Sequence, residues 1–167
     1  MRKLTTPLSQ KDILKLRAGD VVYLSGVIYT ARDMAHRRII ELGPPVDLEG
    51  AVIYHCGPVV RETGNSYEIV SAGPTTSARM NNYLEEILSL GIRGIIGKGG
   101  MNPEPFKGRA VYFAFTGGAG ALAAKSIKRV IDVFWLDLGV PEAIWVLEVE
   151  DFPLLVAIDP HGNSLYL

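Results

Sequence analysis

The sequence has few of the residues that mark several large classes of protein. It contains one cysteine, Cys56, among 167 residues. One cysteine cannot form an internal disulfide, and it cannot by itself hold a zinc ribbon or an iron–sulfur cluster, because those sites need several thiolates. The 17 Lys and Arg residues are balanced by 18 Asp and Glu residues. The chain therefore lacks the excess positive charge typical of nucleic-acid-binding domains, and we expect no nucleic-acid partner.

Long apolar runs are also missing from the sequence. No window approaches the roughly 18 apolar residues of a membrane span, and residues 4–10 do not form the apolar core of a signal peptide. We therefore expect a soluble, cytoplasmic protein with no membrane partner. No internal repeat or shift of composition divides the chain, and its length suits one domain, which we expect to cover residues 1–167.

Strand-like and helix-like segments alternate along the chain, a pattern that favours a layered α/β domain. The clearest helix is expected at 80–88, where apolar residues recur every three or four positions. Other helices are expected at 8–16, 33–42 and 118–130. Strands are expected at 21–29 (with a bulge or bend at Gly26), 51–56, 67–72, 94–97, 110–115, 131–136 and 144–149. A terminal hairpin is expected from 154–158 and 165–166, which makes the sheet mixed rather than purely parallel.

Three loops carry polar groups at the ends of predicted strands, where open α/β sheets usually place their sites. They are residues 29–33, 73–79 and 96–100. In the second loop, the free amides and the positive dipole at the start of a helix would suit an anion. Arg79 lies four residues beyond Thr75, about one turn along the same helix face. Its guanidinium can grip a carboxylate with two parallel hydrogen bonds.

The neighbouring loops add further candidates. Lys98, flanked by glycines, supplies a compact third cation and Arg32 a fourth, while Thr76 places a second hydroxyl beside Thr75. Several cations around a helix start indicate a small ligand with more than one negative charge. Structural alternatives stay open for these residues: Thr75 or Thr76 could serve only as an N-cap, and the arginines could be solvated or paired at the surface.

Other chemically active residues have structural interpretations. His36 lies in a predicted helix and is interpreted as a structural histidine rather than a general base. Cys56 follows an apolar run and is interpreted as a small buried hydrophobic residue. Residues 117–120 (GGAG) precede a predicted helix but lack the spacing of a dinucleotide-binding fingerprint or a P-loop, which favours a role in packing.

Taken in order, several segments resemble the beta subunit of two-subunit, iron–sulfur-dependent hydro-lyases. That family contains class I fumarate hydratase and L(+)-tartrate dehydratase, and the same module forms the C-terminal domain of single-chain class I fumarases. The most specific matches are residues 73–80 (GPTTSARM) and 96–99 (IGKG). Weaker matches lie at 24–26, 31–36, 57–59, 117–119, 137–139, 142–144 and 151–153. Each short match is weak alone, but the ordered set covers nearly the whole chain.

The resemblance implies a swivelling β/β/α domain with a mixed sheet and flanking helices. It also implies a partner, an alpha subunit whose three cysteines hold a [4Fe–4S] cluster, with the active site between the subunits and an α2β2 heterotetramer as the assembly. This chain would then contribute no metal or cofactor ligand, which agrees with its single cysteine. Because the chain begins where the family module begins, we expect a separate subunit.

The reaction that the resemblance implies is the reversible dehydration of a 2-hydroxydicarboxylate, with the open iron of the cluster acting as a Lewis acid on the hydroxyl. (S)-Malate is the expected substrate, because central metabolism requires fumarate hydratase widely, and tartrate is the alternative. Arg32, Arg79 and Lys98 would bind the carboxylates and stabilise negative charge. Thr76 would help to bind the substrate.

Thr75 matches the threonine assigned as the base in this family. A threonine hydroxyl is a very weak acid, so this role requires nearby cations that favour its alkoxide. A function of another class also stays open at this stage: a non-catalytic module that uses its anion pocket to sense a dicarboxylate.

Overall fold

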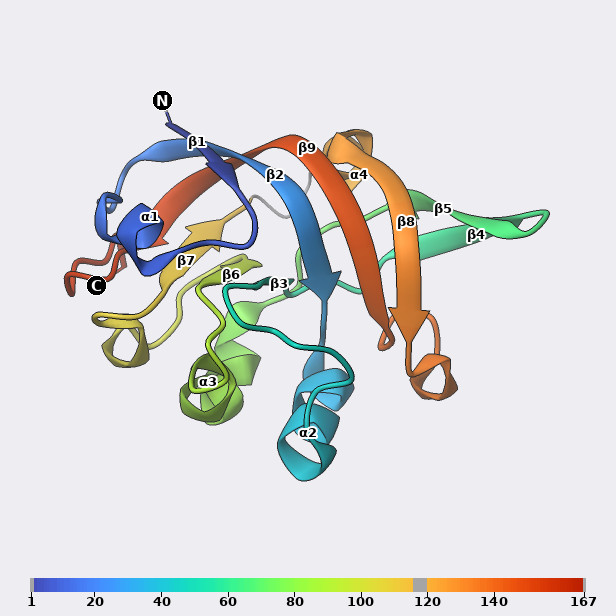
Figure 1. The fold of residues 1–167 in the computed structure, drawn as a ribbon, viewed down its shortest axis with the longest axis horizontal. Coiled ribbons are helices and arrows are strands. Elements are labelled where there is room, and N and C mark those ends of the chain that lie inside the picture. Colours follow the sequence, from blue (N-terminus) through green and yellow to red (C-terminus); the bar gives the residue numbers. More distant parts are fainter. Residues whose placement is uncertain (1, 116–119, 167) are drawn as a thin grey trace.

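The computed structural model describes residues 2–115 and 120–166. Its main element is a seven-stranded sheet in the order β1-β2-β3-β6-β7-β9-β8 (Figure 1). The strands are β1 (Arg2–Thr5), β2 (Val21–Thr30), β3 (Val52–Tyr54), β6 (Gly94–Gly97), β7 (Val111–Ala114), β8 (Ile127–Phe134) and β9 (Ile144–Ile158). Neighbours from β1 to β7 are parallel, whereas β9 is antiparallel to each of its partners. The predicted mixed sheet is confirmed.

The sheet closes on itself, because β9 pairs with β2 as well as with β7. Strands β2, β3, β6, β7 and β9 thus form a ring, and β1 and β8 are attached at its outside. β2 bends at Gly26, where its register against β9 shifts and φ is +109°. A Cβ at this position would collide with the hydroxyl of Thr6, so the bend needs glycine. The predicted bulge at Gly26 is confirmed.

Two hydrophobic cores lie on the two faces of the parallel strands. Successive side chains of a strand point to opposite faces. In β3, Val52 and Tyr54 belong to the first core and Ile53 to the second; in β7, Phe113 belongs to the first and Tyr112 to the second. Since both faces are buried, these short strands read as continuous apolar runs in the sequence.

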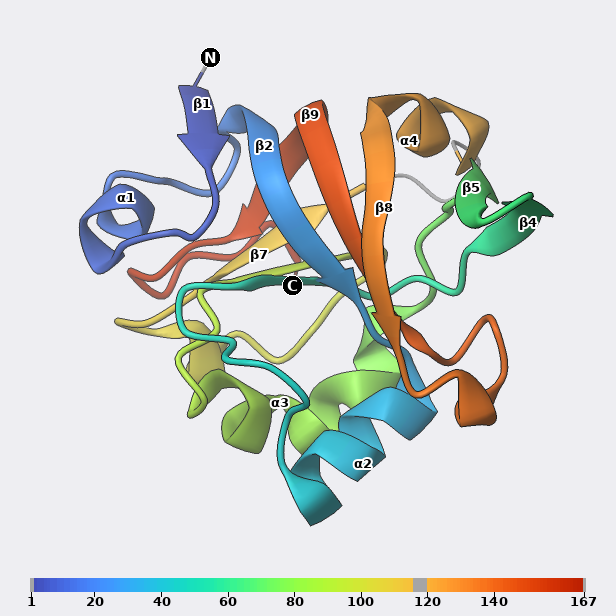
Figure 2. The same ribbon diagram turned by 45° about the vertical axis from the view of Figure 1, so that its right-hand side comes forward.

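Helices cover the second core. α2 (Asp33–Leu42) and α3 (Asn81–Leu88) lie side by side beneath β3 and β6 in both views (Figures 1 and 2). The apolar stripe predicted around residues 80–88 is confirmed, since Met80, Leu84 and Ile87 are buried there. The other helices are α1 (Gln10–Leu14), α4 (Gly120–Ser126) and the 3-10 turns η1 (Ser77–Met80), η2 (Glu104–Phe106) and η3 (Leu136–Leu138). The helices in the described part of the chain are too short to cross a membrane.

The C-terminal third differs most from the prediction. The helix expected to continue to residue 130 ends at Ser126, because Ile127 and Val130 pair with Val149 and Leu147 of β9 and so belong to β8. β9 is one strand of 15 residues rather than two separate ones. The expected terminal hairpin is reduced to a single bridge between residues 158 and 164. The prediction for residues 117–119 lies outside the described residues.

Two strands were not predicted, β1 at the start of the chain and β4. β4 (Val59–Thr63) pairs with β5 (Ser66–Ser71) as a separate two-stranded sheet. This hairpin extends away from α2 and α3 (Figure 2). Most residues of β4 are exposed and its last three are polar, so the segment lacks the apolar pattern of the buried strands.

Candidate active site

The carboxyl ends of β2, β3 and β6 meet at one edge of the sheet, and each continues into a segment with polar side chains. Backbone hydrogen bonds hold these segments together beyond the strand ends. The Ala31 N–H donates to the Tyr54 carbonyl at 3.0 Å, and the His55 N–H donates to the Ile96 carbonyl at 2.8 Å. The loop before η1 joins them, because the Thr75 N–H donates to the His55 carbonyl at 2.8 Å. The three loops singled out in the sequence are therefore neighbours in the fold.

Arg79 links two of these loops. Its Nε and Nη2 donate to the two carboxylate oxygens of Asp33 at 3.1 and 3.0 Å. Nη2 also donates to the Thr75 hydroxyl at 3.1 Å. The two side chains therefore meet as expected, but Thr75 lies before the first helical turn, so they do not share a helix face. The hydrogen bond from Arg79 lowers the pKa of Asp33, and the same bond raises the pKa of Arg79. The Arg79 guanidinium thus makes its bidentate hydrogen bonds to Asp33, a carboxylate of the same chain.

Arg32 is held by a second carboxylate. Its Nε lies 3.2 Å from Glu142 Oε2, an ion pair without hydrogen-bond geometry. The other oxygen of Glu142 accepts the Met34 N–H at 3.1 Å. The side chain of Arg32 also runs closely past Gly57, where a Cβ would come within 2.8 Å of the arginine Cδ and Nη1. These contacts fix Arg32 at the start of α2, one residue from Asp33.

Lys98 differs from the two arginines. In the part of the chain that the structure describes, no carboxylate lies within ion-pair distance of its ammonium. Its backbone forms a parallel bridge with Thr76, and its carbonyl accepts the Ser77 N–H at 3.1 Å. The bridge places Lys98 beside the loop that carries Thr75.

Thr76 occupies the N-cap position of η1, but its side chain makes no capping hydrogen bond, so the N-cap alternative does not describe its side chain. Thr75 precedes the cap, and its hydroxyl is bonded to Arg79. The helix start is also different from the expectation, because the first turn, Ser77–Met80, is a 3-10 helix and α3 begins only at Asn81. The positive charge at this edge of the sheet therefore comes mainly from side chains rather than from a helix dipole.

Two buried histidines lie beneath the loops. The Nδ1 of His36 contacts the Arg32 carbonyl at 2.8 Å, and the Nδ1 of His55 contacts the Ser77 hydroxyl at 2.7 Å. Their rings meet edge to face with centroids 5.1 Å apart. Burial lowers the pKa of His36 to about 4, partly opposed by its bond to the Arg32 carbonyl, and burial also lowers the pKa of His55. The interpretation of His36 as a structural residue is confirmed by its burial and its contact within the helix.

The low pKa of His36 predicts a loss of stability in mild acid. The unfolded chain binds a proton at this residue near pH 6.5, whereas the folded chain does so only near pH 4. Acidification between these values therefore favours the unfolded chain, by about 3 kcal/mol for this residue alone. Urea unfolding measured from pH 7 to pH 4 should show the loss, and His36→Asn should make the dependence on pH shallower. Equal slopes for the two proteins would contradict this prediction.

Sequence reasoning gave no role to Asp33, Glu142 or His55, and it did not predict that Ser77 is buried against His55. Asp33 and Glu142 lie in segments that match the family, at 31–36 and 142–144, so the resemblance contained a signal for both. Ser77 lies in the most specific match. Nothing in the sequence around His55 distinguishes it from the apolar run that precedes it.

The chain offers no site for a metal cluster among its described residues. No group of three or more His, Cys, Asp or Glu side chains in residues 2–115 and 120–166 could hold a metal ion. Cys56 is fully buried, as predicted, and burial raises the pKa of its thiol to about 12. A buried neutral thiol is a poor ligand, because the thiolate is the form that binds metals. These residues therefore do not fit a [4Fe–4S] cluster.

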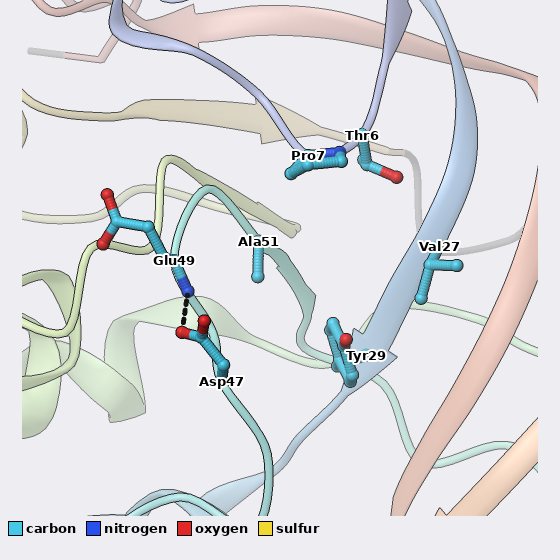
Figure 3. A pocket seen from close by; sticks show the side chains of 7 residues that line it. All are labelled: Thr6, Pro7, Val27, Tyr29, Asp47, Glu49 and Ala51. Carbon is cyan, nitrogen blue, oxygen red and sulfur yellow. Dashed lines mark hydrogen bonds between the residues drawn. The ribbon is translucent and has the colours of Figure 1, made fainter.

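A hollow of about 280 Å³ lies elsewhere, between the start of β3 and the segment after β1 (Figure 3). Two acids, Asp47 and Glu49, line it, together with Tyr29, whose pKa is raised by burial and by Asp47. Asp47 accepts the Glu49 N–H at 3.0 Å. Negative charge of this kind repels a dicarboxylate, so the hollow is not a second candidate for the predicted ligand.

Comparison with known proteins gives the family. A family model described as "Fumarase C-terminus" matches residues 2–167. A protein of Methanocaldococcus jannaschii named "Putative L(+)-tartrate dehydratase subunit beta" is 52% identical over 171 residues, which cover 95% of this chain and 88% of that protein. The "L(+)-tartrate dehydratase subunit beta" of Escherichia coli K12 is 45% identical over 170 residues, covering 97% and 85%.

A longer relative matches as well. A protein of Geobacillus stearothermophilus named "Putative fumarate hydratase class I" is 42% identical over 169 residues. The alignment covers 98% of this chain but only 33% of that protein, so the chain corresponds to about a third of it. A family match over nearly the whole sequence, with relatives of 42–52% identity, shows that this chain belongs to the fumarase C-terminus family.

Proposed function

We propose that the chain is the beta subunit of a two-subunit hydro-lyase that reversibly dehydrates a 2-hydroxydicarboxylate. The observation that carries the proposal is the gathering of the loops with Arg32, Thr75, Arg79 and Lys98 at one edge of the sheet. The names of the relatives, tartrate dehydratase subunit beta and fumarate hydratase class I, support the same class of reaction.

The proposed roles follow from charge. The substrate brings two carboxylates, and removal of a proton from the carbon beside one of them adds negative charge in the transition state. Lys98 and the donors that Arg32 and Arg79 retain would stabilise that charge, because fixed donors need no reorganisation during the reaction. Thr76 is exposed and lies beside Lys98, where its hydroxyl would bind the substrate at the edge of the proposed active site.

Thr75 is proposed as the base that takes the proton. Its hydroxyl accepts a hydrogen bond from the Arg79 guanidinium at 3.1 Å. A donor of this kind favours the anionic form of the oxygen it contacts. Asp33 holds Arg79 on its other side, so the guanidinium stays aimed at Thr75.

The [4Fe–4S] cluster of the family and the alpha subunit form part of the same proposal. Because this chain offers no ligand set for a cluster among its described residues, the cluster is assigned to the alpha subunit, where its open iron would polarise the substrate hydroxyl. The subunit names of two relatives support an alpha subunit as partner, and α2β2 is the proposed assembly.

Two substrates are candidates. (S)-Malate, giving fumarate, is the leading one, and L(+)-tartrate, giving oxaloacetate, is the second, which the names of the relatives at 52% and 45% identity favour. The two differ by one hydroxyl, and a site that hydrogen-bonds a hydroxyl can discriminate strongly between them.

Reconstitution tests the proposal. The chain is co-expressed with the cysteine-bearing alpha subunit and purified without oxygen, and dehydration of malate and of tartrate is measured for the complex and for the chain alone. We expect activity from the complex only. A complex with an intact cluster that converts neither substrate would overturn the proposal. Tight dicarboxylate binding by the chain alone in calorimetry, without turnover by the complex, would instead favour a sensing module.

A further inference from the structure

A buried polar pair lies beneath the loops of the proposed active site. His55 is 1% exposed and Ser77 is fully buried, and the histidine Nδ1 and the serine Oγ are 2.7 Å apart. Most buried polar groups in proteins are hydrogen-bonded, because an unpaired one is unfavourable. The other ring nitrogen of His55, Nε2, has no hydrogen-bond partner among the described residues. Among the described residues, the contact with Ser77 is therefore the one side-chain hydrogen bond of His55.

The backbones of the same two residues hold the loops that carry Thr75 and Lys98. The carbonyl of His55 accepts the Thr75 N–H at 2.8 Å. The N–H of Ser77 donates to the Lys98 carbonyl at 3.1 Å. The side-chain contact between His55 and Ser77 thus connects the attachment point of one loop to that of the other.

The surroundings leave the serine little freedom. A Cβ on Gly97 would collide with the Ser77 hydroxyl, so the serine packs directly against the backbone before Lys98. On the far side of Lys98, the Tyr112 hydroxyl donates to the Gly99 carbonyl at 2.7 Å. Burial raises the pKa of the Tyr112 phenol, so its hydroxyl stays protonated and able to donate this bond. The turn 97–99 is consequently fixed on both sides by buried hydroxyls.

We propose that His55 and Ser77 are positioning residues, whose mutual hydrogen bond sets the spacing between the Thr75 hydroxyl and the Lys98 ammonium. The inference rests on the proposed function, because the spacing matters only if these two groups act on one substrate. Displacement of a reacting group by about 1 Å can reduce a rate about 10²-fold. Neither side chain of the pair needs to touch the substrate.

Two substitutions of His55 separate its two ring nitrogens. His55→Asn places an amide near the position of Nδ1 and can still bond Ser77, whereas His55→Gln places the amide near the position of Nε2. We expect the complex with His55→Asn to keep kcat within about fivefold of the unaltered complex. His55→Gln should lower kcat about 10²-fold with KM changed by less than about threefold, because the lost spacing acts in the transition state.

Ser77→Ala removes the other half of the pair with the smallest change of shape. It should lower kcat about as much as His55→Gln, and the double variant should lose no more than either single one, as expected for two residues that act as a unit. Ile13→Val, a substitution of a fully buried residue in α1, is the control for a general loss of stability. It should lower Tm and leave kcat unchanged.

Amide hydrogen exchange on the chain gives a readout that does not depend on activity. The Thr75 and Ser77 amides should exchange about tenfold faster in His55→Gln than in His55→Asn. Equal kcat and equal exchange in the two His55 variants would overturn the inference, as would losses of kcat that only follow Tm as in Ile13→Val. If the unaltered complex is inactive, the proposed function fails, and the exchange rates still decide whether the pair holds the two loops.

Discussion

Replacing Thr75 with Val is expected to lower kcat of the reconstituted complex about 10³-fold, within the range found for removal of a general base. Val has nearly the shape of Thr without the hydroxyl. Arg79 should stay in place, because Asp33 holds it through two further hydrogen bonds. The loss would therefore report the missing oxygen rather than a moved guanidinium. Steady-state kinetics with the preferred substrate measure it.

Thr75→Ser is the matched control, because it keeps the hydroxyl and removes only a methyl group. We expect it to retain activity within about tenfold of the unaltered complex, the difference coming from the freer rotamer of serine. A complex with Thr75→Val that turns over at the unaltered rate would remove Thr75 from the chemistry, and another group would have to be the base.

Replacing Lys98 with Met is expected to lower kcat/KM by about 10²- to 10³-fold, the usual loss when one fixed donor to developing charge is removed. Met keeps the length of the side chain and removes its charge. Arg32 and Arg79 are partly neutralised by Glu142 and Asp33, whereas no such pairing is found for Lys98 within residues 2–115 and 120–166. Lys98 should therefore contribute a large share of the uncompensated positive charge.

Lys107→Met serves as the control for Lys98→Met. Lys107 is exposed, pairs with Glu104 at 3.1 Å and belongs to none of the three loops of the site. The same change of residue there should leave both kcat and KM as they are. If the two variants behave alike, Lys98 does not act on the substrate. Lys98→Arg should recover part of the activity, since it restores charge but not the compact shape of an ammonium.

The elements that the sequence predicted well are those whose local pattern agrees with their tertiary surroundings. α2 was predicted with its observed bounds, and the stripe of α3 was visible as Leu84, Ile87 and Leu88. The segment after α4 shows the opposite case. Residues 120–130 are rich in small helix-forming residues, but pairing of Ile127 and Val130 with β9 outweighs that preference. Such pairing depends on residues elsewhere in the chain, so it cannot be predicted from the local sequence pattern.

The site was predictable where it depends on residues close in sequence. Thr75 and Arg79 are four residues apart, and their contact was expected from helical spacing. The contact is present, but the loop before the first turn, rather than a shared helix face, brings Thr75 to Arg79. Asp33 and Glu142 reach the arginines from other loops, across 46 and 110 positions of the chain, and only the fold brings them there. Pairing of the arginines was one of the alternatives that the sequence left open, but for this reason the two carboxylate partners were not identified.

The long strand β9 has a consequence for how the chain folds during its synthesis. It supplies partners to β2, β7 and β8, and Val22, near the beginning of the chain, pairs with Leu154, near its end. While β9 is still inside the ribosomal tunnel, the ring stays open, and the edges of β2 and β7 that pair with β9 are unpaired. Contacts between such distant residues form slowly, and open edges attract other chains. The nascent polypeptide therefore cannot close its barrel before β9 has emerged from the ribosome, and chaperones can bind the open strand edges until then.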